Sequence, residues 1–380
     1  MNIAIIGGGI GGLATAIALQ QRGVRANIYE AAPEITAVGA GIMLPPNAME
    51  VLGRLQLADA VRADGFLLDS GEVRDVRDGL LQRFELSGRV DRADMTTLAI
   101  HRARLQRILV SQLPSESVHV GRRCVGVEDT PVGARIRFAD GSELCADVVI
   151  GADGLRSIVR EYVRPGMPLR YAGQTSHRAV ARFSLPNDAL RSGTELWAPG
   201  RRFGFGAIAT DEVYWFTAMD TEAGQREDPL HLHARLTALY ADFPAPVPAL
   251  IAATEPADII HTDLFDFVPM RPWHRGRVVL IGDAAHATTP NLGQGGAQAI
   301  EDAWFLADRL ANCADSRAAF TEFEARRVEK TRRIVERSRQ MGHLGHLRNP
   351  LARRLRNIAL RLVPESVGRR QMESIFRLNF

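Results

Sequence analysis

The chain has 380 residues, of which 47 are lysine or arginine and 44 are aspartate or glutamate, so its formal net charge is +3. This near balance argues against a nucleic-acid partner, which would call for a concentrated basic patch. Hydrophobic residues make up 46% and charged residues 24%, which is ordinary for a globular protein with a sizeable core. The length predicts two domains or one composite domain, at about 100–200 residues per domain.

The cysteines are widely spaced and form no CxxC pair; they are Cys124, Cys145 and Cys313. This spacing argues against a disulfide framework and against a zinc site. The apolar N-terminus carries no positively charged segment and is rich in glycine, so it does not read as a signal peptide. We therefore expect no metal site and a cytoplasmic protein.

The first thirty residues have the pattern of a nucleotide-binding βαβ unit. Residues 2–7 form an apolar run typical of a buried parallel strand, and a helix is expected at residues 10–21. Between them, Gly7, Gly9 and Gly12 give the spacing GxGxxG. Such glycines allow a tight turn, a close backbone approach to a pyrophosphate, and close packing of the helix on the strand.

A second strand is expected at residues 25–29, and it ends at Glu30, which is 18 residues after Gly12. A carboxylate at this place can accept hydrogen bonds from the adenosine ribose hydroxyls. It also disfavours a 2′-phosphate, so the unit alone is compatible with either FAD or NAD.

Two later apolar strands run into aspartate turns. Residues 146–152 lead to Asp153-Gly, and residues 277–282 lead to Asp283 and a glycine-rich loop before a helix at 297–310. Between the GxGxxG motif and the first of these strands, Arg102 lies in the first turn of another predicted helix. Either aspartate alone could belong to an ordinary turn.

Taken in order, the GxGxxG, DG and GD motifs resemble those of the class A flavoprotein monooxygenases, the single-component aromatic hydroxylases of the para-hydroxybenzoate hydroxylase type. The resemblance covers nearly the whole chain and is strongest to the alkylquinolone 3-hydroxylase, FAD-dependent urate hydroxylase and salicylate hydroxylase types. It implies an α/β fold: a Rossmann-like FAD-binding domain (1–170 plus 271–340), a mixed β-sheet substrate domain (171–270) and a C-terminal helical segment (341–380).

The resemblance also implies where FAD binds. Asp283 would contact the ribityl chain, Arg102 the ribityl-pyrophosphate region, and the amides of residues 293–297 the flavin pyrimidine. Many relatives have asparagine where this chain has Ala297, but a backbone contact survives that change. The expected FAD contacts are Gly7, Gly9, Gly12, Glu30, Ala31, Met43, Arg102, Cys124, Asp153, Asp283, Pro290, Gly293, Gly295, Gly296 and Ala297.

The activity that the resemblance implies is hydroxylation of an aromatic or heteroaromatic small molecule by O2, through a C4a-hydroperoxyflavin. NADH or NADPH would serve as a transient reductant, which agrees with the lack of a second GxGxxG. Two other interpretations stay open, namely an alkene epoxidase of the zeaxanthin epoxidase type and a non-catalytic flavin-fold binding protein. The sequence does not name the substrate or choose between a monomer and a homodimer.

Residues 171–270 predict sheet strands separated by turns, followed by a helix at 229–243. Arg202 and Tyr214 match, at the same 12-residue separation, an arginine and a tyrosine that meet the substrate in urate hydroxylase. Relatives with other substrates share the pair, so it does not identify urate. His177 is the one candidate for a general base.

The segment at residues 349–364 predicts a basic amphipathic helix. Such a helix can lie on a membrane surface, which would give the protein a peripheral membrane contact. The alternative is a helix that packs on the FAD-binding domain and exposes its arginine face to solvent.

Overall fold

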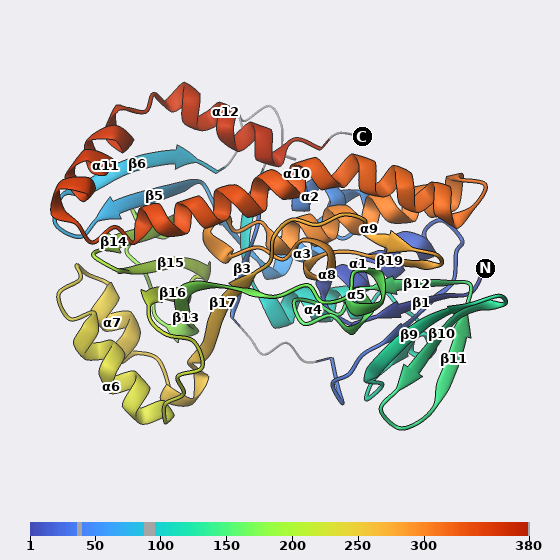
Figure 1. Cartoon of the computed structure of the whole chain (residues 1–380). Coiled ribbons are helices and arrows are strands. Elements are labelled where there is room, and N and C mark those ends of the chain that lie inside the picture. The colour runs from blue at the N-terminus through green and yellow to red at the C-terminus, as the bar shows by residue number, and fades with distance from the viewer. Residues whose placement is uncertain (36–39, 87–95, 379–380) are drawn as a thin grey trace.

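Two large β-sheets organise the chain (Figure 1), and the computed structural model describes them within residues 1–35, 40–86 and 96–378. The side chains of residues 365, 369 and 371 lie outside that description. The mixed α/β architecture agrees with the fold class that the sequence predicts.

The first sheet is the nucleotide-binding one. Its five neighbouring strands from β19 to β8 run parallel, and β18 pairs antiparallel with β19 at one edge. The central strand β1 is buried along its whole length, as expected of an apolar strand in a parallel sheet. The order is β18 (His274–Arg275), β19 (Val278–Leu280), β12 (Val148–Gly151), β1 (Ile3–Ile6), β2 (Ala26–Tyr29) and β8 (Val118–His119).

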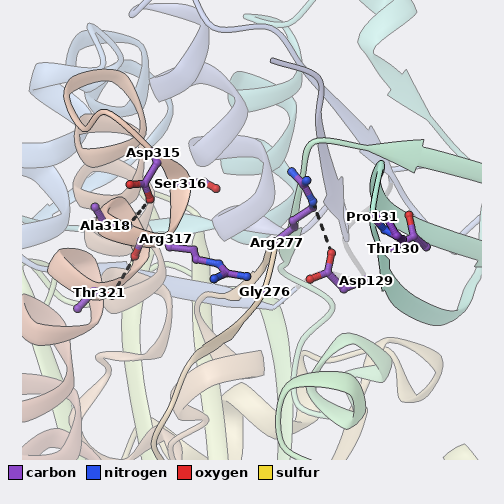
Figure 2. Close-up of a pocket in the computed structure, with 10 residues that line it drawn as sticks. All are labelled: Asp129, Thr130, Pro131, Gly276, Arg277, Asp315, Ser316, Arg317, Ala318 and Thr321. Atoms are coloured by element: carbon purple, nitrogen blue, oxygen red, sulfur yellow. Dashed lines mark hydrogen bonds and ion pairs between the residues drawn. The ribbon is translucent and has the colours of Figure 1, made fainter.

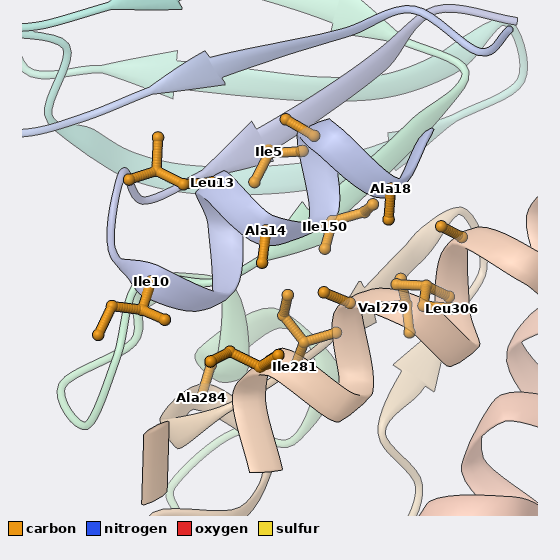
Figure 3. Close-up of a cluster of buried hydrophobic side chains, with 14 of the residues drawn as sticks. Ile5, Ile10, Leu13, Ala14, Ala18, Ile150, Val279, Ile281, Ala284 and Leu306 are labelled. Atoms are coloured by element: carbon orange, nitrogen blue, oxygen red, sulfur yellow. The ribbon is translucent and has the colours of Figure 1, made fainter. Parts of the chain in front are cut away.

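Helix α1 (Ile10–Gln20) packs against this sheet and against α9 (Gly295–Asn312). Figure 3 shows how small side chains of α1, Ala14 and Ala18, face the apolar residues of β12, β19 and α9. Alanine at this seam lets the helix approach closely, and close packing gives the interior its density. The first three predicted elements are therefore confirmed, within a residue at their ends.

The second sheet has seven strands and carries residues that are far apart in sequence. Strands β14 and β5 pair in parallel, and all other neighbours pair antiparallel. The order is β17 (Ile260–Asp266), β13 (Arg170–Arg182), β16 (Glu212–Asp220), β15 (Arg201–Ala209), β14 (Ser192–Ala198), β5 (Ser70–Asp75) and β6 (Gly79–Glu85). We call it the substrate sheet, after the role that the resemblance implies for it.

One face of the substrate sheet packs on α6 (Pro229–Leu239) and α7 (Val247–Ala252). Phe203, Phe205 and Trp215 are buried in this layer, and Phe203 stacks on Trp215 with ring centroids 5.4 Å apart. These aromatic side chains form core. The other face of the sheet is left for the site.

Two small antiparallel sheets and several short helices complete the inner part of the fold. They are β3 (Gly41–Leu44), β7 (Thr97–His101) and β4 (Phe66–Leu68); β9 (Cys124–Thr130), β10 (Gly133–Phe138) and β11 (Glu143–Ala146); α2 (Pro46–Arg54), α3 (Ala58–Asp64), α4 (Arg102–Val110), α5 (Ile158–Val163) and α8 (Asp283–His286); and the 3-10 turns η1 (Ser115–Ser117), η2 (Pro256–Asp258) and η3 (Pro290–Leu292).

The long helix α10 (Ser316–Gly345) crosses from the nucleotide-binding sheet to the substrate sheet (Figure 1). Helices α11 (Pro350–Leu362) and α12 (Glu365–Phe376) follow it and lie beyond β6. Within the described ranges, no helix combines the length and the apolar character needed to cross a membrane.

Candidate functional site

The GxGxxG turn takes a shape that only glycine allows. Gly7 has φ +110°, and a Cβ there would lie 2.4 Å from the carbonyl oxygen of Ala152. A Cβ on Gly12 would lie 2.0 Å from the Gly7 oxygen, whereas a Cβ on Gly9 would meet nothing within 4 Å. Gly7 and Gly12 are thus required by packing, and Gly9 borders open space where a ligand can approach.

The N-terminus of α1 begins at this turn and has no side-chain cap and no acidic residue in its first turn. Its first amide groups are therefore available to an anion, and the helix dipole favours negative charge there. An 11-residue helix with this opening is suited to the pyrophosphate of a dinucleotide.

Glu30 holds the same turn from the end of β2. Its carboxylate accepts hydrogen bonds from the Gly8 amide at 2.6 Å and the Ala32 amide at 2.8 Å. Ala31 is part of this bend. From α4, Gln106 donates to the Gly8 oxygen at 3.4 Å, while its buried Oε1 has no partner among the described residues. Glu30 therefore shapes the turn.

Asp153, in the DG turn, caps α5. It accepts hydrogen bonds from the Ser157 hydroxyl at 2.5 Å and from the Ile158 and Val159 amides at 2.7 and 3.1 Å. Burial raises the pKa of Asp153, and these hydrogen bonds oppose that rise. Burial also raises the pKa of the nearby Cys124 thiol to about 11, so this thiol is protonated at neutral pH.

Arg102 and Asp283 lie within electrostatic range of each other, although 181 positions separate them in the sequence. Both residues are exposed to solvent, yet protein atoms surround each side chain closely. This combination describes groups that line a recess in the protein. Burial lowers the pKa of Arg102 and raises that of Asp283, and in each case the charge of the other opposes the shift.

A buried carboxylate fixes the backbone around Asp283. Asp302, on α9, accepts hydrogen bonds from the Gly282 amide at 2.9 Å and from His286 Nε2 at 2.6 Å. The His286 and Arg327 charges more than offset the burial of Asp302 and lower its pKa to about 2. Arg327 also contacts Glu301, so α10 holds α9 by a buried ionic network. His286 therefore has a structural partner, as expected for a histidine in a packed turn.

The loop after α8 leads into the N-terminus of α9. Gly293 adopts the left-handed conformation at φ +61°, and α9 begins at Gly295 without a side-chain cap or an acidic residue in its first turn. Strand β3 lies against this loop, because a Cβ on Gly293 would be 4.0 Å from Met43 and one on Gly296 would be 2.8 Å from Ile42. Of the other expected contacts here, Pro290 opens η3 and Ala297 is buried.

Arg202 and Tyr214 share the face of the substrate sheet that looks away from α6 and α7. Arg202 pairs with Ala218, and Gly206 pairs with Tyr214, so the two side chains are on one face at different levels. A Cβ on Gly41 would lie 2.4 Å from the Tyr214 ring, so β3 packs directly on that tyrosine. Burial raises the pKa of Tyr214, opposed by the charges of Arg178 and Arg102.

The flavin motifs and the substrate sheet therefore meet at Tyr214. Arg102, which lies next to Asp283, is also electrostatically coupled to Arg178 and Tyr214. Arg178 pairs with Phe216 on β16 and belongs to the same face as Tyr214. The phenol remains protonated at neutral pH and can donate a hydrogen bond. No hydrogen bond of its hydroxyl is found within the described residues.

Arg202 has an internal role that the sequence did not indicate. Its guanidinium donates to Glu195 at 2.8 Å and to the side-chain oxygen of Asn291 in η3, and Nε is buried without a partner among the described groups. The Arg202 side chain also packs on Gly345, where a Cβ would lie 2.7 Å from its Cδ. Arg202 thus joins the substrate sheet to α10 and to residues 287–294, the loop before α9, which we call the flavin loop after the role that the resemblance implies for it.

His177 lies on the opposite face of the substrate sheet. Its Nδ1 is 3.1 Å from the Thr217 hydroxyl, and its ring meets His261 edge-on with centroids 5.1 Å apart. Burial, followed by the charge of His261, lowers its pKa to about 3. A neutral imidazole among core residues, on the face away from Tyr214, does not favour the predicted role as general base.

The structure adds residues that sequence reasoning missed. Arg160 on α5 donates to the Ala284 oxygen at 3.3 Å and so ties the DG turn to α8. The other residues that the sequence did not indicate are Arg178, Asn291 and Asp302. The signal for Asp302 was an acidic pair within the apolar face of a predicted helix. Asn291 gave no signal, because its partner is 89 positions away.

A separate hollow lies on the outside of the molecule, between the β9–β10 turn and the start of α10 (Figure 2). Charges of both signs line it, and Arg277 pairs there with Asp129 at 3.6 Å. None of its lining residues belongs to the glycine or aspartate motifs. Among the described residues, no group of histidine, cysteine and acidic side chains could hold a metal ion.

The site fits FAD on the chemistry of its own groups. Two helix N-termini, those of α1 and α9, have no side-chain cap and would offer amides to the pyrophosphate and to the flavin of a bound FAD. Gly9 leaves room for a close approach, and the recess contains a cation and a carboxylate, Arg102 and Asp283, that have no direct hydrogen bond to each other among the described contacts. These features match a long ligand with phosphate, ribityl and flavin parts.

Comparison with known proteins agrees with this geometry. The model of the FAD binding domain family matches residues 1–338. Aurachin C monooxygenase/isomerase of Stigmatella aurantiaca is 37% identical over 96% of this chain and 94% of its own length. The 2-heptyl-3-hydroxy-4(1H)-quinolone synthase of Pseudomonas aeruginosa is 36% identical over 99% and 98%.

Among solved structures, Klebsiella pneumoniae HpxO complexed with FAD and uric acid has a TM-score of 0.89 and 31% identity, over 99% of this chain and 96% of that one. The family model, the similar proteins and the fold all agree with the GxGxxG, DG and GD motifs of the sequence. The protein therefore belongs to the family of FAD-dependent monooxygenases.

Proposed function

We propose that this enzyme uses NAD(P)H and O2 to hydroxylate an aromatic or heteroaromatic small molecule on the face of the substrate sheet that carries Tyr214. The observation that carries the proposal is the meeting of Arg102 and Asp283 with Tyr214 and Arg178. Two expected flavin contacts, Arg102 and Asp283, are thus close to the polar side chains on this face of the substrate sheet. Epoxidation and simple binding find no such specific support.

Bound FAD supplies the redox chemistry, namely hydride acceptance and activation of O2. The residues of the chain bind it, position the substrate and exclude water. The amides at the start of α9 favour negative charge near the flavin pyrimidine. Arg102 keeps a positive charge within the recess throughout.

We infer that the substrate carries an oxygen that can accept a hydrogen bond, as an oxo or hydroxy heteroaromatic ring does. Tyr214 stays protonated and can donate a hydrogen bond to that substrate oxygen. The positive charge of Arg178 favours the phenolate or enolate form of the substrate. An anionic ring is richer in electrons and reacts more readily with an electrophilic oxygen. The terminal guanidinium nitrogens of Arg202 already donate to Glu195 and Asn291. Arg202 therefore contributes through its Nε or by positioning the sheet.

Within this class we favour bicyclic 4-quinolone-like rings. Two of the relatives are named for quinolone or aurachin chemistry, and they align with at least 96% of this chain at 36–37% identity. HpxO, whose structure holds uric acid, is also similar over the whole chain. A purine is therefore the second candidate class.

Other features of the protein also stay proposals. Three free cysteines, one of them buried and one exposed, suit a cytoplasmic protein. A monomer and a homodimer are both compatible with the fold. A peripheral membrane contact through the C-terminal helix is the third such feature.

The test is a substrate screen with the FAD-loaded protein. NADH and NADPH oxidation are each followed with 4-quinolones, purines, phenols and polyenes, while hydrogen peroxide and product are quantified together. We expect one ring class to accelerate oxidation and to yield a product with one added oxygen. Acceleration with peroxide as the sole oxidised product, for every compound, would overturn the hydroxylase proposal.

A further inference from the structure

Helix α11 presents its apolar side to solvent. Four large aliphatic side chains are exposed, namely Leu351 at 67%, Leu355 at 60%, Ile358 at 45% and Leu362 at 74%. Their spacing of four, three and four residues places them on one side of an α-helix. A helix on a globular surface ordinarily buries such a stripe, so this one is inverted. We call these four residues the α11 stripe.

Polar contacts hold the inner side of α11. Arg353 and Arg356 both contact Asp75 of β5, at 3.0 and 3.1 Å, and Asn357 donates to Asp78 at 2.6 Å. Asp75 is almost fully buried, and it binds both guanidinium groups with one carboxylate oxygen. These contacts fix the rotation of α11, so the stripe cannot turn inward without depriving that buried carboxylate of both its ion-pair partners.

This arrangement corrects the helix orientation in the alternative that the sequence offered for the segment. That alternative had the helix packed on the FAD-binding domain, with an arginine face in solvent. The structure packs α11 beside β6 of the substrate sheet, turns two arginines inward and leaves the leucines outside.

The charged residues of α11 are all arginines. Arg354 and Arg361 lie seven residues apart along one flank of the α11 stripe, and residues 350–362 include no acidic residue. Arg354 is exposed and has no partner among the described groups, whereas Arg361 donates to backbone oxygens of Asp78 and Leu80. An apolar stripe with a cationic flank complements a surface whose outer layer is anionic and whose interior is apolar.

A second copy of the chain is a poorer occupant. Two such helices face to face would bring arginines together, and no acidic residue within α11 could compensate them. An anionic lipid surface meets both requirements, because aliphatic side chains enter the acyl boundary while arginines reach the headgroups. Other strongly exposed aliphatic residues, such as Val132 at 83% and Leu230 at 70%, lie on other elements and form no comparable stripe with it.

We propose that α11 docks the enzyme on anionic membranes, lying in the plane of the interface with its leucine stripe in the lipid. Docking through α11 places β6 and the substrate sheet at the lipid side of the molecule (Figure 1). The inference does not depend on which ring the enzyme hydroxylates.

The experiment measures co-sedimentation of the FAD-loaded full chain with two kinds of vesicle. One is pure phosphatidylcholine, and the other is an equimolar mixture with phosphatidylglycerol. We expect binding to the anionic vesicles, weakened by salt because part of the attraction is ionic. Leu355→Glu and Ile358→Glu should each reduce the partition coefficient about tenfold or more.

Arg354→Gln should reduce partition onto anionic vesicles by about fivefold, as loss of one basic residue near a charged surface predicts, and should leave the weak binding to neutral vesicles unchanged. Val132→Glu is the matched control, since it adds the same charge at an exposed turn between β9 and β10, far from α11 in Figure 1. It should bind like the wild type. Flavin content and circular dichroism confirm that each variant is folded.

Two results would overturn the proposal. One is a failure of the vesicle test, in which the wild-type protein stays in the supernatant with anionic vesicles or the Leu355→Glu variant binds them as well as the wild type does. The other is a dimer in sedimentation velocity that Leu355→Glu dissociates, together with absent vesicle binding, which would make the α11 stripe an interface between copies. Turnover of a water-soluble substrate is measured in parallel, so failure of docking and failure of the proposed activity are told apart.

Discussion

Arg202 donates a hydrogen bond to the side-chain oxygen of Asn291 and thereby connects β15 of the substrate sheet to the turn that precedes α9. Asn291 in turn donates to the Ser338 backbone oxygen of α10 at 2.8 Å. Sheet, flavin loop and long helix therefore share one set of contacts. The position of the substrate face relative to the flavin depends on this connection.

Replacing Arg202 with glutamine tests that dependence. Arg202→Gln loses the contacts to Glu195 and Asn291, and hydrogen bonds to charged groups of this kind contribute about 1.5–3 kcal/mol each. We expect kcat/KM to fall about tenfold to a hundredfold. Peroxide formed per NAD(P)H should rise, while the protein keeps its flavin.

The matched control is Arg201→Gln, which removes a neighbouring guanidinium that pairs with Asp242 on the outside of the sheet. That variant should resemble the wild type in both coupling and kcat/KM. Equal losses in the two variants would mean that the Asn291 connection has no special effect.

Gly41→Ala tests the contact between β3 and the substrate face. The added methyl group would lie 2.4 Å from the Tyr214 ring, so the ring must move. Overpacking of this kind costs about 1–3 kcal/mol, measurable by urea denaturation. Peroxide release should also increase, because Tyr214 no longer orients the substrate. Gly193→Ala, whose methyl group would meet only Leu68 at 3.8 Å, should leave stability and coupling close to the wild type.

Glu30→Gln tests the hold of the carboxylate on the GxGxxG turn. Glutamine keeps the shape but loses the charge that strengthens the hydrogen bond from the Gly8 amide. The dissociation constant for FAD, titrated with the apoprotein by flavin fluorescence, should rise about tenfold. Glu50→Gln removes an exposed ion pair with Arg54 and serves as the control. FAD affinity that is unaltered in Glu30→Gln would refute this assignment.

His177 makes stability depend on pH. Its pKa in the fold is about 3, below the ordinary value of 6.5, because of burial and the nearby His261 and Arg235 charges, with Asp263 opposing. Below pH 6.5 the unfolded chain therefore takes up a proton that the fold excludes, so stability falls as the pH falls toward 3. By pH 5 this linkage amounts to about 2 kcal/mol.

Urea denaturation at pH 7 and pH 5 measures this effect. We expect His177→Gln to lose less stability between the two pH values than the wild type does. The same loss in both proteins would show that His177 is accessible to protons in the fold. The pH profile of kcat, recorded for both, tests the predicted general base separately.

Local chemistry explains what the sequence predicted well. The unit β1–α1–β2 depends on neighbours in the chain, because an apolar strand, a glycine turn and a helix are each encoded within about ten residues. The same holds for the turns at Asp153 and Asp283, where a buried strand ends at an acidic residue. The family resemblance then connected these separate motifs.

Long-range contacts account for most of what was missed. Strands β5 and β6 join the substrate sheet because β5 pairs in parallel with β14, with Ser70 opposite Ser192. No local sequence pattern predicts this pairing. The division into three domains therefore stays a prediction. Likewise, the orientation of α11 depends on Asp75, 278 positions before Arg353, and periodicity alone predicts the opposite face inward.

The most direct test of the account is the fate of molecular oxygen. The FAD-loaded enzyme is supplied with NAD(P)H, the ring compound that best accelerates its oxidation, and isotopically labelled 18O2, and the product is analysed by mass spectrometry. A monooxygenase of this family places one labelled atom in the product and the other in water. A product without label, or labelled peroxide as the only oxidised species, would contradict the assignment of this site to ring hydroxylation.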